Sequence, residues 1–339
     1  MKRIAVVAAF AISLLATPPG ARAAEIGHYN GGFLNIRDYF VPPEPGVYGA
    51  AYNYFYTTDR VNDRHGDEID NIVVSPGPGP GVPIDLDVDV DLYALGLALI
   101  WVSDWEVLGA RYAALVAPTF ANASVQASLS IGNRLGGNVD NASFNVGDML
   151  VQPVWLGWSL EHFDFSAAYG FYAATGKYDT ETRFLLGNPV VVESPDNIGY
   201  GFWTHQVQGA AAWYPFDHKG TAVTSALTYE YHSEKEDFDL QPGQNLSVNW
   251  GISQYVPLTK SQQLLLEIGP AGFSSWQVSS DRGADASNSN HDRVHAAGGQ
   301  LGLSYVPWNL AVNFHSFYEY STRDRFQGLA LGLSLAKKF

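Results

Sequence analysis

Residues 83–101 read PIDLDVDVDLYALGLALIW, and the first half of this stretch alternates between acidic and aliphatic side chains. Four aspartates occupy every second position, and four aliphatic residues lie between them: Asp85, Asp87, Asp89 and Asp91, and Leu86, Val88, Val90 and Leu92. A helix would spread such a spacing around its axis, whereas a β-strand places each set on one face. The stretch therefore predicts a strand with one polar and one apolar face. Soluble β-sandwiches contain such strands too, so other segments must distinguish the classes.

The N-terminus has the features of a secretory signal peptide. Lys2 and Arg3 precede an apolar run, residues 4–16, that is too short to span a bilayer. Ala21-Arg22-Ala23 matches an A-x-A cleavage site. We therefore expect residues 1–23 to be removed on export; the alternative is an uncleaved membrane anchor.

The composition favours a membrane barrel over a secreted domain held by disulfides. The chain has no Cys, although exported proteins often carry disulfides. Loss of the three basic residues of the signal peptide changes the formal net charge from −15 to about −18, which argues against nucleic acid as a partner. Charged residues make up only 16% of the chain and aromatic residues 14%. These properties are typical of outer-membrane barrels.

Twelve segments with strand-like patterns follow residue 46. They lie near residues 47–58, 86–102, 107–118, 149–160, 164–175, 200–214, 221–232, 245–255, 263–278, 294–306, 310–320 and 327–339. The first, third and fifth connections comprise about 27, 30 and 24 residues, whereas the second, fourth and sixth are short. Outer-membrane barrels sort their connections in this way. We therefore predict an all-β fold, a transmembrane antiparallel β-barrel of about 12 strands over residues 47–339, in contact with lipid of the bacterial outer membrane; the alternative is 14 strands.

Aromatic residues mark both predicted membrane interfaces. Five tryptophans fall near the short turns and two near the long loops: Trp101, Trp105, Trp158, Trp213 and Trp308, and Trp203 and Trp276. Two belts fit two lipid interfaces, although tryptophans scattered through a core are the alternative. The chain ends on Phe339 after alternating leucines, which is the usual signal read by the barrel assembly machinery. Lys337 departs from that pattern.

The predicted barrel assigns a face to each polar residue. We expect the aliphatic residues of 86–92 to face lipid and the four aspartates to line the lumen, where they would favour cations. A Ca²⁺ or Mg²⁺ site is the alternative, but four carboxylates without a fixed loop make a poor cage. No metal or cofactor is therefore expected. Four further residues are expected in the lumen, either on a substrate path or as ordinary polar lining: Glu230, His232, His315 and Glu319.

The sequence carries no catalytic signature that we recognise. Outer-membrane phospholipases place a His and a Ser two positions apart on one strand, and none of the nine histidines has Ser at that position. Paired acids at the rim, as in an outer-membrane protease, remain an alternative. We therefore predict that the protein is not an enzyme.

Several positions after residue 188, and a few before it, form a recognisable pattern. They are Asn197, Gly199, Gly201, the turn Tyr214-Pro215-Phe216-Asp217, Tyr229-Glu230, Pro242-Gly243, Trp250-Gly251, and earlier Gly147-Asp148 with Gln152-Pro153. With these positions the chain resembles the outer-membrane family associated with the meta-pathway of phenol degradation, which is distantly akin to the long-chain fatty-acid channels.

This resemblance implies a function for the barrel. It implies passive uptake of small hydrophobic or aromatic ligands; the alternative is a structural or adhesive barrel without transport. It also implies that residues 24–46 plug the lumen, whereas a disordered periplasmic tail is the alternative. The Pro/Gly-rich run from Ser75 to Pro83 is expected to form a loop, either a lid over the mouth or a plain surface loop.

Overall fold

The structure is a computed structural model that describes residues 27–74, 82–131, 134–139, 142–185, 188–194, 196–286 and 291–339. The predicted signal peptide and most of the run from Ser75 to Pro83 lie outside these residues. Within the described ranges, no helix is long and apolar enough to cross a membrane.

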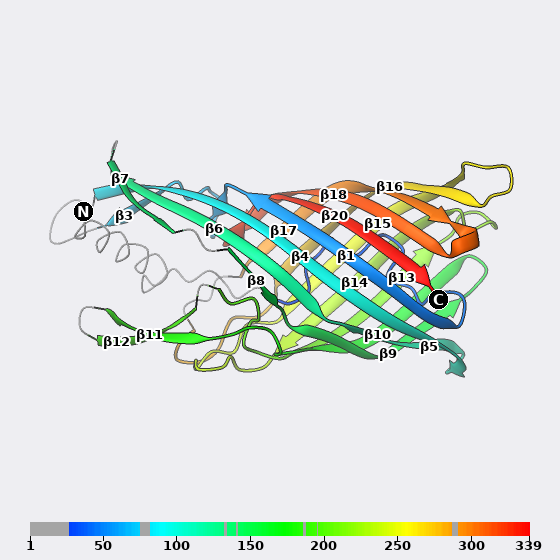
Figure 1. Ribbon diagram of the computed structural model, residues 1–339, viewed down its shortest axis with the longest axis horizontal. Coiled ribbons are helices and arrows are strands. Elements are labelled where there is room, and N and C mark those ends of the chain that lie inside the picture. Colours follow the sequence, from blue (N-terminus) through cyan, green and yellow to red (C-terminus); the bar gives the residue numbers. More distant parts are fainter. Residues whose placement is uncertain are drawn as a thin grey trace.

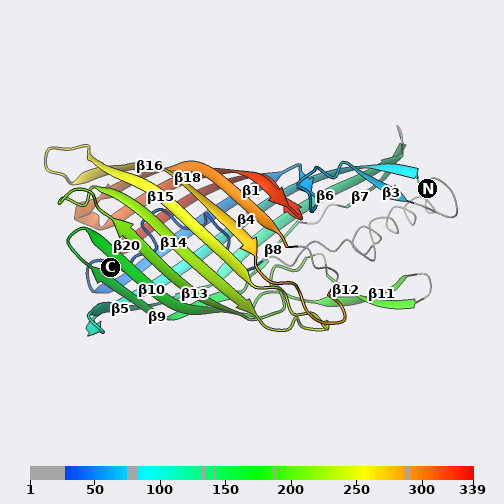
Figure 2. The same cartoon turned by 180° about the vertical axis from the view of Figure 1, so that it is seen from behind.

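One antiparallel sheet closes on itself to form a barrel (Figures 1 and 2). Its strands are β1 (Gly46–Thr58), β4 (Val82–Val107), β5 (Ala110–Ala117), β9 (Met149–Ser159), β10 (Phe163–Ala173), β13 (Thr204–Trp213), β14 (Thr221–His232), β15 (Asn245–Pro257), β16 (Leu264–Gln277), β17 (Arg293–Tyr305), β18 (Leu310–Arg323) and β20 (Leu329–Lys338). Each pairs with the next in the chain, and β1 pairs with both β20 and β4. The predicted twelve-stranded barrel is confirmed.

One part of the wall is taller than the rest. The first half of the 26-residue strand β4 pairs with β6 (Thr119–Ile131), which continues β5 beyond Pro118 in the same register. Strands β3 (Asn71–Val74), β7 (Arg134–Val139) and β8 (Ala142–Val146) extend this sheet. Figure 1 shows it projecting at the end of the barrel opposite the C-terminus. Much of the predicted third loop is therefore strand, because Pro118 interrupts the hydrogen bonding without ending the pairing.

Short elements occupy other predicted connections. The fifth contains the hairpin of β11 (Thr180–Leu185) and β12 (Asn188–Glu193), and β2 (Val61–Asn62) pairs with β19 (Arg325–Phe326). The second connection lies later than predicted: β4 runs to Val107, and Leu108 and Gly109 form the turn with φ of 55° and 73°. Two positive φ angles match the right-handed twist of a hairpin.

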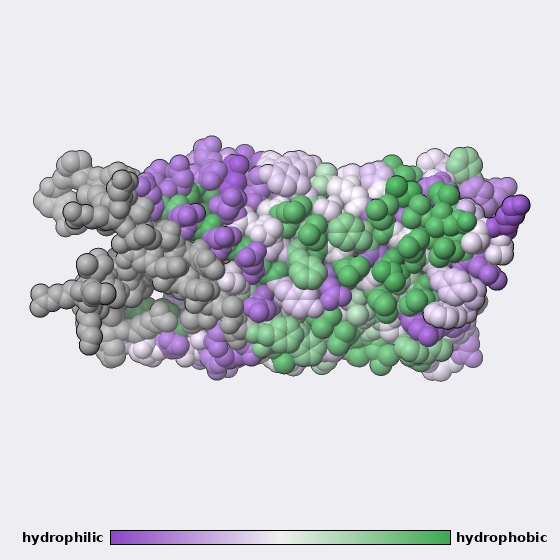
Figure 3. Space-filling model, turned by 45° about the horizontal axis from the view of Figure 1, so that its top comes forward, coloured by the Kyte–Doolittle hydropathy of each residue, from purple (hydrophilic) through white to green (hydrophobic). Residues whose placement is uncertain are grey.

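The strands expose an apolar face to lipid. In β14 every second residue is buried, and the residues between them are exposed: Val223, Ser225, Leu227, Tyr229 and Tyr231. On the face drawn in Figure 3, apolar residues gather over the barrel wall and hydrophilic residues lie toward the projecting end. Tryptophans are exposed near the turns, at Trp101, Trp105, Trp213 and Trp308, and Trp203 is exposed near the opposite end. This outer surface is that of a membrane barrel.

The position predicted for the four aspartates is wrong. Asp85, Asp87, Asp89 and Asp91 are exposed and share the face of β4 that carries Leu97, Leu99 and Trp101, which are exposed to lipid. The pairing of β4 with β1 and β6 keeps one register throughout, so this face does not change sides. Leu92, on the other face, lines the lumen cavity described below. Asp85, Asp87 and Asp89 lie in the part of β4 that projects past its pairing with β1, and Asp91 lies near the end of that pairing, opposite Thr57, so we expect their outward charges to fall outside the lipid band.

Candidate functional site

The segment before β1 lies inside the barrel. Residues 27–41 form turns and bends, yet Tyr29, Ile36 and Tyr39 are buried. Three of its backbone N–H groups donate to side chains of the lumen wall: Tyr29 to Glu230 Oε1 at 2.8 Å, Gly32 to Asn249 Oδ1 at 3.0 Å and Ile36 to Gln300 Oε1 at 2.9 Å. A segment without secondary structure needs such partners, because a buried N–H group without one is costly.

Glycines in the wall make room for this segment. A Cβ atom on Gly251 of β15 would lie 2.8 Å from Ile36, and one on Gly157 of β9 would lie 2.7 Å from Val41. Carbon atoms do not approach so closely, so any larger residue would displace the segment. Gly251, which belongs to the family pattern, therefore has a packing reason to be glycine.

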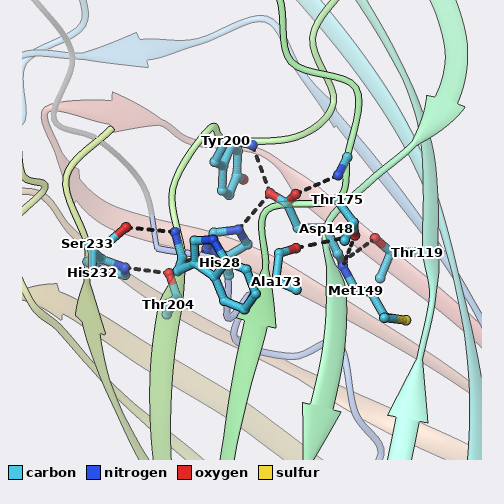
Figure 4. Close-up of polar contacts among 12 residues, drawn as sticks. His28, Thr119, Asp148, Met149, Ala173, Thr175, Tyr200, Thr204, His232 and Ser233 are labelled. Atoms are coloured by element: carbon cyan, nitrogen blue, oxygen red, sulfur yellow. Dashed lines mark hydrogen bonds and ion pairs between the residues drawn. The ribbon is translucent and has the colours of Figure 1, made fainter. Parts of the chain in front are cut away.

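A chain of hydrogen bonds fixes the first end of the segment (Figure 4). His28 Nε2 lies 2.8 Å from Asp148 Oδ2, and His28 Nδ1 lies 2.7 Å from the hydroxyl of Thr204. That hydroxyl also lies 2.7 Å from His232 Nδ1. With His28 neutral, these contacts are satisfied when its Nε2–H donates to the carboxylate and its Nδ1 accepts from Thr204, whose oxygen accepts from Nδ1–H of His232. The amide of Asn245, 2.9 Å from His232 Nε2, must then turn its N–H group toward that nitrogen.

The electrostatics of His28 and Asp148 agree with this arrangement. Burial lowers the pKa of His28, although the hydrogen bond with Asp148 opposes the shift. Burial alone would raise the pKa of Asp148, but hydrogen bonds from His28 and from the backbone N–H groups of Tyr200 and Gly176 hold it below its ordinary value. At neutral pH the pair is thus a neutral imidazole donating to a carboxylate.

Arg37 fixes the segment nearer the short turns. Its Nε donates to Ser253 Oγ at 2.8 Å and to Glu267 Oε1 at 3.1 Å, and its terminal nitrogens donate to the carbonyls of Lys219 and Gly220. The guanidinium also lies 4.3 Å from the ring centre of Tyr255. The segment is therefore held at two points, one toward each end of the lumen.

The four other predicted lumen residues are buried on inward faces, but they do not converge. Glu230 and His232 hold the segment through Tyr29 and Thr204. His315 Nδ1 lies 3.3 Å from Asn35 Oδ1, and Glu319 accepts from Tyr56 and from the N–H of Gly328. Among the described residues, no three His, Cys, Asp or Glu side chains could hold a metal ion. In this structure the four residues contact the segment or the wall.

Sequence reasoning missed three residues that anchor the segment: His28, Arg37 and Asp148. Arg37 is the only Lys or Arg between positions 24 and 46, and a single permanent cation in a segment expected to enter a lumen is a usable signal. Asp148 lay within the recognised pattern but was given no role. Its contact with His28 spans 120 residues of sequence, so no local spacing indicates it.

A cavity of about 410 Å³ remains between the segment and one side of the barrel. Strands β4, β5 and β6 contribute small and aliphatic side chains, including Ala94, Ala98, Ile100, Leu115 and Ala121. The segment contributes Tyr29, Phe33 and Leu34, and β9 and β13 contribute Gln152, Gln206 and Gln208. An apolar cavity of this size with a few polar groups is typical of a small-molecule site.

The remaining positions of the family pattern shape loops and the barrel ends. Asn197 makes two hydrogen bonds with the backbone of Asp179, and Gly201, with φ of 72°, lies against Tyr178. A Cβ on Gly199 would lie 2.8 Å from Gly176, and one on Gly243, after buried Pro242, would lie 2.0 Å from the carbonyl of Ser279. Trp250 faces outward. The backbone N–H of Phe339 donates to Val47, and its side chain is exposed.

A closed antiparallel barrel with an apolar outer band and a partly filled lumen defines an outer-membrane β-barrel protein. Residues 58–335 match the family described as "Putative MetA-pathway of phenol degradation". The chain belongs to this family, which confirms the resemblance found in its sequence.

Solved structures show the same architecture. The COG4313 outer membrane channel from Pseudomonas putida F1 is 16% identical, with a TM-score of 0.60 over 90% of this chain and 100% of that one. The NalP translocator domain from Neisseria meningitidis is 10% identical, with a TM-score of 0.44 over 90% of this chain and 92% of that one. A mutant of the TodX monoaromatic hydrocarbon channel is 11% identical, with a TM-score of 0.41 over 88% of this chain and 91% of that one. The first likeness concerns the fold alone, and the other two support no argument. No curated protein sequence matches the chain.

Proposed function

We propose that the protein is an outer-membrane channel for the passive uptake of small hydrophobic or aromatic compounds. The observation that carries this proposal is the lumen cavity of about 410 Å³, with its apolar wall on β4, β5 and β6. Membership in a family described by phenol degradation supports the aromatic part. The driving force would be the concentration gradient that catabolism in the cell maintains.

We further propose that residues 24–46 act as a movable plug. The described part of this segment, from Gly27 onward, occupies the lumen and is held mainly by hydrogen bonds rather than by strand pairing. Individual hydrogen bonds are weak in net terms, about 0.5–1.5 kcal/mol each. The plug can therefore shift while the ladder of the barrel stays intact.

The test compares uptake of a labelled aromatic hydrocarbon by wild-type cells, a deletion strain and the deletion strain carrying the gene. We expect uptake at low external concentration to fall in the deletion strain and to return on complementation. In a second arm, a variant lacking residues 27–40 should show larger conductance in a planar bilayer than the full chain. Unchanged uptake in the deletion strain, together with no conductance in either protein, would favour a structural barrel.

A further inference from the structure

Two arginines face each other across neighbouring strands of the barrel. Arg293 is the first residue of β17 and Arg323 is the last residue of β18, and the register of the two strands makes them direct partners. Direct partners in an antiparallel pair carry their side chains on the same face of the sheet, with Cβ atoms about 4.5–5.5 Å apart. Two like charges at this spacing repel each other, so the pair is unfavourable unless an anion binds between them.

The alternation of both strands directs this pair outward. Val294, the residue after Arg293, is fully buried and packs with Ile36 of the plug in one cluster, and Thr322, the residue before Arg323, is also fully buried. Successive residues of a strand point to opposite faces, so the two arginines lie on the outer face. Ser321, with φ of 53°, lies at the irregularity that shifts β18 by one residue and brings Arg323 to this face.

The protein supplies no counter-charge to the pair, although the chain has 34 acidic residues and only 19 basic ones. Arg325, two residues further on, pairs with buried Asp292 at 3.1 Å, whereas no ion pair among the described residues includes Arg293 or Arg323. One terminal nitrogen of Arg293 donates to Ser321 Oγ at 3.3 Å, and the Nε atoms of both arginines are enclosed without a partner. The remaining terminal nitrogens are not enclosed, so a ligand can reach them.

The outer surface next to the pair has the character of a membrane interface. Trp276 of β16 is the cross-strand partner of Arg293 on its other side. In the next outward row, the ring of His295 stacks on Tyr320, with 5.8 Å between ring centres, and Tyr318 in the row after that is 59% exposed. Trp and Tyr side chains gather at the level where lipid head groups meet the hydrocarbon. The pair therefore lies at the head-group level, directly above the lipid-facing band.

The position of the pair along the barrel identifies the leaflet. Outer-membrane barrels place their long connections outside the cell and their short turns in the periplasm. The pair lies at the end where the long connection 278–292 joins β16 to β17, opposite the short turn Val306–Trp308 between β17 and β18. A guanidinium group matches a phosphate group with two parallel hydrogen bonds. The head group that the pair meets belongs to the outer leaflet.

We propose that Arg293 and Arg323 bind a phosphate group of an outer-leaflet lipid, whose acyl chains lie along Tyr320 and Tyr318. The partner is a phosphorylated lipid rather than a free phosphate ion, because the cationic pair continues without a break into the lipid-facing surface. The bound phosphate removes the repulsion between the two arginines and so stabilises the long-loop end of the barrel. This surface lies outside the lumen and does not depend on the proposed uptake function.

The test measures binding of lipid A to the purified full chain in neutral detergent by native mass spectrometry. The probes are diphosphoryl lipid A, lipid A without its phosphates, and inorganic phosphate as a competitor. EDTA is present so that divalent cations do not join phosphate to the outward aspartates of β4. We expect the Arg293→Gln/Arg323→Gln variant, and also the removal of the phosphates, to weaken binding at least about tenfold, because hydrogen bonds between charged groups are lost.

A matched variant controls for the change in net charge. Arg64→Gln/Arg282→Gln removes two exposed arginines from the long loops at the same end of the barrel, and it should bind lipid A as tightly as wild type. Thermal unfolding gives a second readout. Without lipid, the Arg293→Gln/Arg323→Gln variant should unfold at a temperature no lower than wild type, because it has lost a repulsion, whereas lipid A should raise the midpoint of wild type alone.

Several results would overturn the proposal. Equal binding of lipid A with and without phosphate, or unchanged binding in Arg293→Gln/Arg323→Gln, would show that the pair does not hold the head group. An equal loss in the control variant would show that net charge rather than the pair attracts the lipid. Displacement of lipid A by an equimolar amount of inorganic phosphate would indicate a site for free anions. If the double variant does not form a heat-modifiable barrel, Arg323→Gln alone removes the facing charge for the same comparison.

Discussion

Replacing Asn249 by Leu should release the plug without harming the barrel. Asn249 Oδ1 accepts the backbone N–H of Gly32 at 3.0 Å, and its Nδ2 donates to the hydroxyl of Tyr29 at 2.8 Å, so both of its side-chain bonds hold the plug. Leu has a similar volume but makes neither bond. The Gly32 N–H is then buried without a partner, which costs about 1–3 kcal/mol. This cost falls on the seated state alone and raises the population of the displaced plug about 5- to 150-fold.

The absence of cysteine from the chain provides a clean assay. Ile36 is buried against Gly251 of β15, so the thiol of an Ile36→Cys variant is shielded while the plug is seated. When the plug closes faster than a water-soluble maleimide reacts, the labelling rate follows the displaced population. We expect labelling to be about 5- to 150-fold faster in the Asn249→Leu background, the same factor as above.

A second buried asparagine serves as the matched control. Asn313 of β18 also faces inward, but no hydrogen bond joins it to the described part of the plug. Asn313→Leu should leave the labelling rate unchanged, and boiling should shift the gel migration of both variants as it shifts that of wild type. Equal labelling rates in the two variants, with both barrels intact, would refute the view that these hydrogen bonds hold the plug.

Four further outcomes are expected. Because burial lowers the pKa of His28, the seated plug favours the neutral imidazole, whereas the displaced plug takes up a proton. The labelling rate should therefore rise as the pH falls below about 6.5, by at most about tenfold per pH unit. His28→Phe should remove this dependence, since Asp148, whose pKa is lowered, stays charged in that window. Gly251→Val should raise single-channel conductance by displacing Ile36, whereas Gly209→Val, whose Cβ would meet nothing within 4 Å, should not. Changing Asp85, Asp87, Asp89 and Asp91 together to Asn should leave ion selectivity in bilayers unchanged, because these residues face outward. Deleting Phe339 should lower the amount of assembled barrel in outer-membrane fractions while export continues.

The architecture was predictable because the environment of a membrane barrel enforces a period of two. One face of each strand meets lipid and the other meets the lumen, so β14 and β18 alternate along most of their length. The count of alternating segments supplied the strand number, and the connection lengths distinguished a membrane barrel from a β-sandwich. Of the projecting wall, the part of β4 from residue 86 was predicted, but β6, β7 and β8 were not, because polar strands above the membrane need no lipid-facing pattern.

The direction of the aspartates shows the limit of a periodic pattern. Alternation shows that a strand has two different faces but not which face is inside, because a shift of one residue exchanges the two faces. The deciding signal lies a few residues later, where Leu97, Leu99 and Trp101 continue the aspartate positions into the lipid band. The polarity of residues in the projecting part of a strand therefore does not indicate which face is inward where the same strand crosses the membrane.

The candidate site depends on contacts that no spacing reveals. His28 reaches Asp148 and Thr204 across 120 and 176 residues of sequence. Sequence indicated a polar lumen, whereas the distribution of its hydrogen bonds required the structure.

The location of the plug's partners sets the time at which it can be seated. The plug precedes β1, yet its backbone N–H groups bond to residues 201, 217 and 264 positions later in the chain. Contacts of such high sequence separation form only after the intervening chain has been ordered. The segment that precedes every barrel strand in the chain is thus the last to reach its native place. An assembling barrel passes through a stage with an empty lumen, and factors that bind the free N-terminal segment would act during that interval.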